Sequence, residues 1–289
     1  MEKDIVPALL ELIESEFDKK TFNSEVLKKA VQALRDKKAT YQDANSFAIE
    51  IGEILSQVLN THITFETLPD GRMYYNIADR IMNSTMKKNY ELITGYTIDV
   101  QTELNQAAGF GLKGQKPKLN KSRIDGIIER LSTAEEFEDI KWIIDEPIKN
   151  FSQSIVDDMV RTNAEFQAKS GLNPKIVRKP DRNPCDWCKG LVGEYDYNEV
   201  SDQGNDVFRR HDYCRCTVTF EPRRGNSTTV HSGTRGSRKY VQDKYGGYEL
   251  SKKARVKRAQ EMAATEKARR DAARKKRIET WERKNASTK

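Results

Sequence analysis

The sequence predicts a mainly α-helical protein with a small α+β module that carries a Cys/His cluster, followed by a basic C-terminal tail that is helical or disordered. Three observations support this fold class. Apolar residues recur at helical spacing through the first 170 positions. Beyond Gly171, short segments of period-two character replace that pattern. From residue 251 onward the chain is rich in Ala, Lys, Arg and Glu but poor in large apolar residues.

The length and composition indicate that the chain is divided into several structurally different segments. The chain has 289 residues, of which 36% are hydrophobic and 33% are charged. This balance places part of the chain outside any compact core. We therefore expect a helical body at 1–170, a strand-rich Cys/His module at 171–222, a flexible linker at 223–250 and a basic helical tail at 251–289.

The helical body should contain a series of amphipathic helices that pack on one another. Asp4 is available to cap the first, and Pro7 stands near its first turn, where its missing N–H costs little. Gly171 ends the last, as glycine often does at a helix C-terminus. The apolar spacing places helices at residues 6–17, 23–34, 47–58, 74–104, 124–131, 133–144 and 148–166.

The connections between these segments have their own signals. Pro69-Asp70-Gly71 indicates a turn before the fourth helix. Residues 106–121 contain several glycines and lysines but fit neither glycine fingerprint of a phosphate-binding loop, so we interpret them as an exposed loop.

Short strands are expected in the module, at residues 175–178, 193–197 and 217–220. Residues 223–247 are rich in Gly, Ser, Thr and Arg and show no core pattern, which is typical of a flexible linker.

The charge is unevenly distributed. The net charge is +7, but residues 251–289 hold 15 Lys/Arg against 5 Asp/Glu, a surplus of +10, which leaves about −3 for residues 1–250. A polyanionic partner should therefore bind at the C-terminus.

No apolar run approaches the roughly 20 residues that cross a bilayer. The N-terminus also lacks the basic, apolar and small-residue order of a secretory signal. We expect no membrane anchor, and residence in a reducing cytoplasm with reduced thiols.

The strongest local signal is a cluster of all four cysteines within 32 positions. Cys185 and Cys188 stand three positions apart, and His211 and Cys214 repeat that spacing, with Cys216 two positions further on. Five donors therefore compete for four tetrahedral positions. The matching spacing favours the first four, whereas an extended chain would place Cys216 beside Cys214. Sulfur donors predict one zinc ion with a structural role.

Other interpretations of the cluster are disulfides, a thioredoxin-like redox motif, an iron–sulfur site or unrelated buried thiols. A single dithiol does not explain a second Cys/His pair, and the βαβ context of the redox motif is missing. Pro184 and the two cysteines that follow match half of the zinc deaminase signature, but no His-x-Glu element accompanies His62, His211 or His231. There is neither a nucleophile elbow nor a P-loop lysine, so no enzymatic activity is expected.

The order of elements around the cluster resembles a known family. Arg-Thr-Asn-Ala-Glu at 161–165 in a long helix precedes a short strand at 175–178 and Asp181. The cysteine pair then leads to Leu-Val-Gly-Glu-Tyr at 191–195, and His-Asp-Tyr-Cys-Arg-Cys-Thr at 211–217 follows. This order is similar to that of the Mu F-like phage minor head proteins, also called head morphogenesis proteins, over about a quarter of the chain (151–220). Members usually have proline where Asp212 stands.

The resemblance implies a structural protein of a tailed bacteriophage, present in few copies and associated with the portal. Such a protein is made in the host bacterial cytoplasm and resides in the phage head near the portal. Residues 1–150 lie outside the shared motif, and we assign them the contacts with portal and head proteins.

The basic tail suggests a second partner, packaged double-stranded DNA bound without sequence preference. The alternative is a solvated helix with no partner. The residues expected to contact phosphates are Lys252, Lys253, Arg255, Lys257, Arg258, Lys267, Arg269, Arg270, Arg274, Lys275, Lys276 and Arg277.

A different class of function, a cytosolic zinc-finger regulator that binds nucleic acid, is the main alternative. It would need a recognition helix beside the metal, whereas residues 189–210 read as strand-like. An enzyme acting on nucleic acid would need an acidic metal cluster or a histidine base, and the sequence shows neither.

Overall fold

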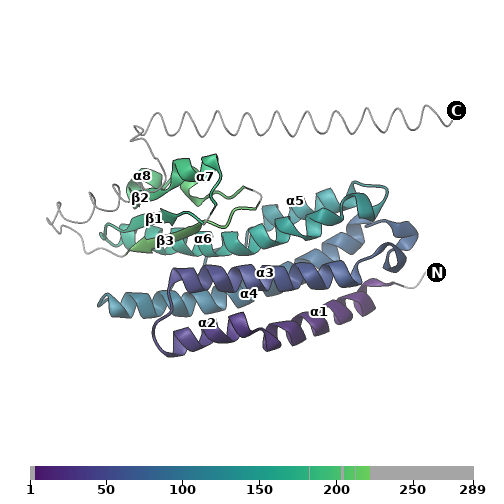
Figure 1. Ribbon diagram of the computed structural model, residues 1–289, viewed down its shortest axis with the longest axis horizontal. Coiled ribbons are helices and arrows are strands. Elements are labelled where there is room, and N and C mark those ends of the chain that lie inside the picture. The colour runs from purple at the N-terminus through teal and green to yellow at the C-terminus, as the bar shows by residue number, and fades with distance from the viewer. Residues whose placement is uncertain (1–3, 182, 203–204, 212, 222–289) are drawn as a thin grey trace.

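The structure is a computed structural model that describes residues 4–181, 183–202, 205–211 and 213–221. The expected linker and basic tail, with all twelve proposed DNA-contacting residues, lie outside the described residues. The described part of the protein is mainly helical with one small antiparallel sheet, which confirms the mainly α class with a small β part (Figure 1).

Six long helices form the body. Their bounds are α1 Val6–Asn23, α2 Glu25–Arg35, α3 Tyr41–His62, α4 Tyr75–Ala107, α5 Lys121–Ser132 and α6 Glu146–Lys169. Side chains cap several of them: Ser24 accepts a hydrogen bond from the Leu27 N–H at the start of α2, and Thr40 and Asp43 form a capping box at the start of α3.

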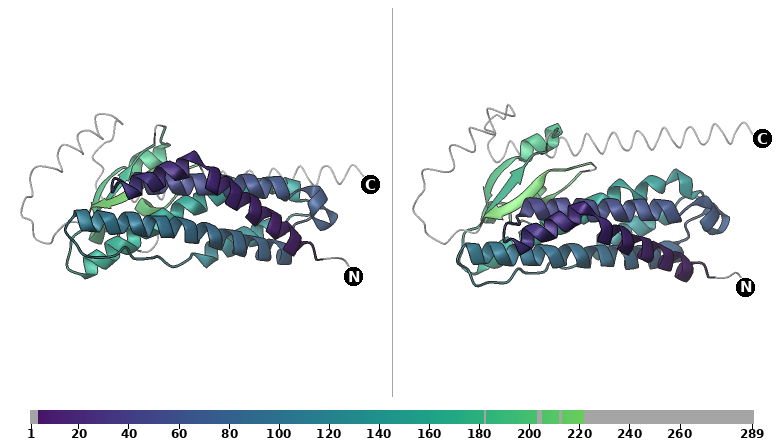
Figure 2. Two further views of the ribbon diagram at one scale, coloured as in Figure 1. Left: turned by 90° about the horizontal axis from the view of Figure 1, so that it is seen from below. Right: turned by 60° about the horizontal axis from the view of Figure 1, so that its bottom comes forward.

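These helices run along the long axis of the molecule as an elongated bundle (Figures 1 and 2). Helix α3 packs against α1, α2, α4 and α6, and α5 covers α4. Helices α3 and α6 approach closely at Gly52, where an added Cβ would lie 2.7 Å from the Ser152 Oγ. A side chain larger than hydrogen at position 52 would therefore push the two helices apart.

The connection between α5 and α6 differs from the prediction. The sequence pattern indicated a helix at 133–144, but the structure has two short 3-10 turns, η3 Phe137–Asp139 and η4 Lys141–Ile144. Phe137, Ile143 and Ile144 are buried, so two separate turns satisfy the apolar spacing. The chain leaves helical geometry at Asp145, and α6 then begins at Glu146 with Pro147 in its first turn, where proline is tolerated. Between α3 and α4 the expected turn at residues 69–71 is present as η2 Pro69–Gly71, preceded by η1 Phe65–Thr67.

The three expected strands are present as β1 Lys175–Lys179, β2 Gly193–Asp196 and β3 Thr217–Glu221. They form one sheet in the order β2-β1-β3, and both pairings are antiparallel. Ile176 in the central strand stands opposite Tyr195 on one side and Phe220 on the other.

The segment that follows Cys188 is less strand-like than predicted. Besides β2 it contains the end of α7 Asp186–Leu191, then α8 Tyr197–Val200 and η5 Asp206–Phe208. Tyr197, expected at the end of a strand, is the first residue of α8. The thiol of Cys185 accepts a hydrogen bond from the Cys188 N–H and so caps the first turn of α7, a local effect that the period-two pattern does not reveal.

The sheet packs on α6 and α3, and its buried residues join the core of the helical body (Figure 2). Ile176, Val218 and Phe220 belong to this shared core, and the ring of Phe220 lies 5.8 Å from that of Tyr41 in α3. The metal-binding candidates are therefore held against the helical body. No helix in the described ranges is long and apolar enough to span a membrane.

Candidate metal centre

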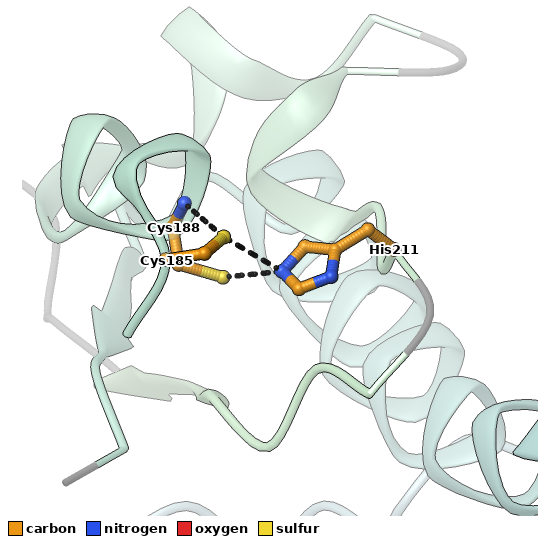
Figure 3. Close-up of side chains that lie close together, drawn as sticks. All are labelled: Cys185, Cys188 and His211. Atoms are coloured by element: carbon orange, nitrogen blue, oxygen red, sulfur yellow. Dashed lines mark hydrogen bonds between the residues drawn. The ribbon is translucent and has the colours of Figure 1, made fainter. Parts of the chain in front are cut away.

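Two turns bring the five predicted donors to the same place. Cys185 and Cys188 belong to the first turn of α7, whereas His211 and Cys214 lie between η5 and β3, with Cys216 directly before β3. Figure 3 shows the sulfurs of Cys185 and Cys188 pointing at the same imidazole nitrogen of His211. All four cysteines are free.

The donor atoms are close together. The Nε2 of His211 lies 3.1 Å from the Sγ of Cys185 and 3.0 Å from the Sγ of Cys188, and the latter sulfur lies 3.6 Å from the Sγ of Cys214. The donors form two groups of three whose ligand atoms lie within 4.8 Å of one another: Cys185, Cys188 and His211, and Cys188, Cys214 and Cys216. Cys188 is common to both and is the centre of the cluster.

The second turn is tight. The Cys214 N–H donates to the His211 carbonyl at 3.2 Å, which closes the turn. Tyr213 between them has a φ of 62°, in the left-handed region that residues with a bulky side chain seldom adopt. Tyr213 itself is exposed, so its backbone rather than its side chain shapes the site. Such a backbone conformation persists only where the surrounding structure imposes it. At Tyr213 it lets the chain turn so that His211 and Cys214 face the same side.

The cluster fits a metal ion. Tetrahedral coordination with bonds of about 2.0–2.3 Å requires donor atoms roughly 3.3–3.8 Å apart, and the three donor distances given above, 3.0–3.6 Å, approach that range. Three of the four thiols are buried, and only Cys185 is exposed. Four of these five residues could hold an ion.

The thiols are poised to bind cations. Hydrogen bonding with Cys188 and Cys216 lowers the pKa of Cys214 well below its usual range, while the hydrogen bond with Cys214 raises the pKa of Cys188. Of these two thiols, Cys214 is the one that loses its proton more readily. The thiolate is the form that ligates metals.

Three arginines surround the cluster, and sequence reasoning missed all of them. Arg178 on β1 donates to the carbonyls of Val207 and Arg209 at 2.6 and 2.9 Å, and its guanidinium lies 5.3 Å from the ring centre of Trp187. The ring of Trp187 in turn meets that of His211 edge-on. Through these contacts Arg178 holds in place both the backbone before His211 and the Trp187 ring that packs against His211.

Arg210, next to His211, connects this segment with the helical body. Its guanidinium makes two hydrogen bonds to the carboxylate of Asp157 on α6, and both side chains are almost fully buried, at 1% and 2% exposure. It also donates to the Cys216 carbonyl at 2.8 Å. Burial lowers the pKa of Arg210, but the Asp157 carboxylate and the thiols of Cys214 and Cys216 together raise it by more, so this side chain stays charged.

Arg215 forms a second connection to the same helix. It donates to both carboxylate oxygens of Glu146 at 2.7 and 3.1 Å, in the bidentate geometry that suits arginine. Arg210 and Arg215 thus bind opposite ends of one stretch of α6.

Their partners form a polar stripe on α6. Glu146, Asn150, Gln153 and Asp157 follow helical spacing and are all nearly fully buried. From sequence, such a stripe reads as the solvent face of an amphipathic helix. In the structure the Cys/His segment covers it. The arginines flanking His211 and Cys214 were the only available signal of this arrangement.

The other two histidines, His62 and His231, were not predicted to bind the metal. The Nε2 of His62 lies 2.6 Å from a carboxylate oxygen of Glu16 in a partly buried pair between α1 and α3, far from the cysteines in sequence and in no metal-binding group. His231 lies outside the described residues.

Comparisons of the chain with protein-family models, curated proteins and solved structures found no match.

Proposed function

We propose that this protein is a structural minor capsid protein of a tailed bacteriophage, in which one zinc ion fastens a small sheet module to a helical body. The observation that carries the proposal is the convergence of the two spaced Cys/His pairs, in the order that resembles the Mu F-like minor head proteins, into one cluster of neighbouring donor atoms. Three of the four thiols are buried, which suits an ion with a structural role.

Zinc is the metal that the donor set favours. Cysteine sulfur and imidazole nitrogen are soft to intermediate donors, and tetrahedral sites built from them are typical of structural zinc. Bound zinc would hold the α7 turn and the 211–216 turn together. The buried arginine–carboxylate pairs then transmit that constraint to α6. The proposed role of the ion is therefore structural rather than catalytic.

The helical body is the part we assign to portal and head contacts, because its elongated shape offers long faces for specific burial of surface (Figure 1). If so, a chain lacking residues 251–289 should still enter phage heads at near-normal levels. The measurement is quantitative immunodetection in purified heads, with complementation by the full chain as control. Absence of the folded truncated protein from heads would contradict this division of roles, and absence of the full chain from phage particles would contradict the proposed function.

The basic tail is the part we assign to packaged DNA. With 15 basic and 5 acidic residues, it should bind duplexes of any sequence, and neutralising about six to eight phosphates gives a slope of log K against log salt of roughly −5 to −7. Pairing of its acids with neighbouring lysines and arginines weakens this only slightly, since exposed pairs contribute about 0–1 kcal/mol. The test is a salt titration of the full chain and of the chain lacking 251–289 on two unrelated duplexes. Salt-insensitive or sequence-selective binding, or equal binding by the truncated chain, would rule out this role.

The alternative, a zinc-finger regulator, has little support in the geometry. The helix beside the cluster, α7, has six residues, and its lysine, Lys189, is paired with Asp186 at 3.0 Å. A helix that reads bases in the major groove needs several free polar side chains over more than one turn.

A further inference from the structure

Arg178 is a buried cation with an unusual set of partners. It is the last but one residue of the central strand, with 1% exposure, on the same face as Ile176. Its Nη1 is occupied by backbone carbonyls, and its Nη2 points at two sulfurs, 3.6 Å from that of Cys214 and 3.9 Å from that of Cys188. Within the described ranges, no carboxylate lies within ion-pair distance of Arg178.

The other two arginines at the site differ in this respect. Arg210 is paired with Asp157 and Arg215 with Glu146, so each of these pairs adds no net charge to the buried region. Arg178 has no carboxylate partner of its own among the described residues, and the Asp157 carboxylate that pairs with Arg210 is the acidic group that acts on it from a longer distance. The two arginines and this one carboxylate therefore leave one uncompensated positive charge. A buried guanidinium without a counter-charge is strongly unfavourable, so an anion is needed next to it, and the two sulfurs are the groups in place.

The charge of a zinc centre depends on its ligands. Zn²⁺ with four thiolates carries a net charge of −2, whereas Zn²⁺ with three thiolates and one neutral imidazole carries −1. Only the second is neutralised by a single guanidinium. The 3.0–3.1 Å distances from the Nε2 of His211 to two of the sulfurs also place the histidine inside the donor cluster.

We propose that the centre binds zinc through three cysteine thiolates and His211, and that Arg178 is the positioning residue that neutralises this centre and donates hydrogen bonds to its sulfurs. The fourth thiol then stays outside the coordination sphere. This inference rests on the zinc assignment of the proposed function and does not depend on the phage role. It accounts for an arginine in a central strand, where burial would otherwise disfavour it.

The first test is replacement of Arg178 by glutamine in the full chain, with zinc affinity measured by chelator competition. We expect affinity to fall about 10–100-fold, the usual effect of removing a group that supports metal ligands. Zinc should also be released at higher pH, because thiolates that have lost a neighbouring cation are protonated more easily. Arg178→Lys, which keeps the charge, should recover part of both effects. The control is Arg209→Gln, whose exposed side chain pairs with Asp206 and should leave both values unchanged.

The second test counts the ligands and does not require the Arg178 variants to fold. Each cysteine is replaced by serine and His211 by asparagine, and Co²⁺ is used as the spectroscopic probe for thiolate coordination. Three of the four serine variants and His211→Asn should lose affinity, and one serine variant should keep it. Equal loss in all four serine variants with His211 dispensable would show a four-thiolate site and overturn the proposal.

A folded Arg178→Gln variant with unchanged affinity and unchanged pH of release would overturn the role of the arginine. A wild-type chain that binds no zinc would instead contradict the zinc assignment itself, so the two failures are distinguishable.

Discussion

Replacement of Cys188 by serine is expected to abolish tight metal binding and to loosen the chain between Asp181 and Cys216. Cys188 belongs to both groups of donors, so its loss leaves no group of three neighbouring ligand atoms among those found in the described residues. The affinity for zinc should fall by more than the roughly 100-fold that loss of a supporting residue can cause. Because binding energy at such a site is also folding energy, the segment should lose its fixed structure.

Limited proteolysis with mass mapping measures this loosening. New cleavages should fall within 183–216, while α1 to α4 remain protected by a core that does not include the cysteines. The sheet should be affected less than the two turns, since Ile176, Val218 and Phe220 pack on the helical body. Wild-type protein stripped of metal should show the same cleavages and lose them when zinc is restored, whereas the variant should not respond. An unchanged cleavage pattern in stripped wild type would show that the metal does not hold the segment.

Removing one partner of the Arg210–Asp157 pair is expected to destabilise the protein by about 3–5 kcal/mol, because it leaves the other charge buried and unpaired. Asp157→Leu and Arg210→Met are the two single changes. The double variant Asp157→Leu with Arg210→Met should be much less destabilised than the sum of its parts, since it buries no charge. Urea unfolding gives the free energy of each variant.

The matched control is the more exposed Arg209–Asp206 pair, whose arginine is the neighbour of Arg210 in the chain. Its removal should cost only about 0–1 kcal/mol. Losses of similar size at the two pairs would show that Arg210 and Asp157 do not anchor the Cys/His segment to α6.

The sequence was informative where one local pattern decides the structure. Helical apolar spacing located α1 to α6, because each helix buries one continuous stripe, and short alternating segments located all three strands. The same rule failed at 133–144, where the spacing of Phe137, Ile143 and Ile144 fits a helix but the connection to α6 folds into two 3-10 turns. The spacing of apolar residues therefore predicts which side chains are buried. It does not predict whether one continuous helix or two short 3-10 turns bury them.

The donors of the candidate metal centre were predictable, but their surroundings were not. Cysteine and histidine have few common roles, so their spacing carries chemical meaning. Arginine, glutamate and aspartate are mostly exposed, so neither Arg178 nor the polar stripe from Glu146 to Asp157 stands out in the sequence. Their burial follows from the docking of the sheet module on α6, a contact between segments distant in the chain.

The measurement that tests the central claim most directly is the metal content of the purified full-length protein, determined by elemental analysis together with a count of thiols that react with a disulfide reagent. We predict about one zinc per chain, with the reactive thiols increasing to four when the metal is removed. Protein that is folded, free of bound metal and fully thiol-reactive from the start would contradict the claim that an ion holds the two turns together.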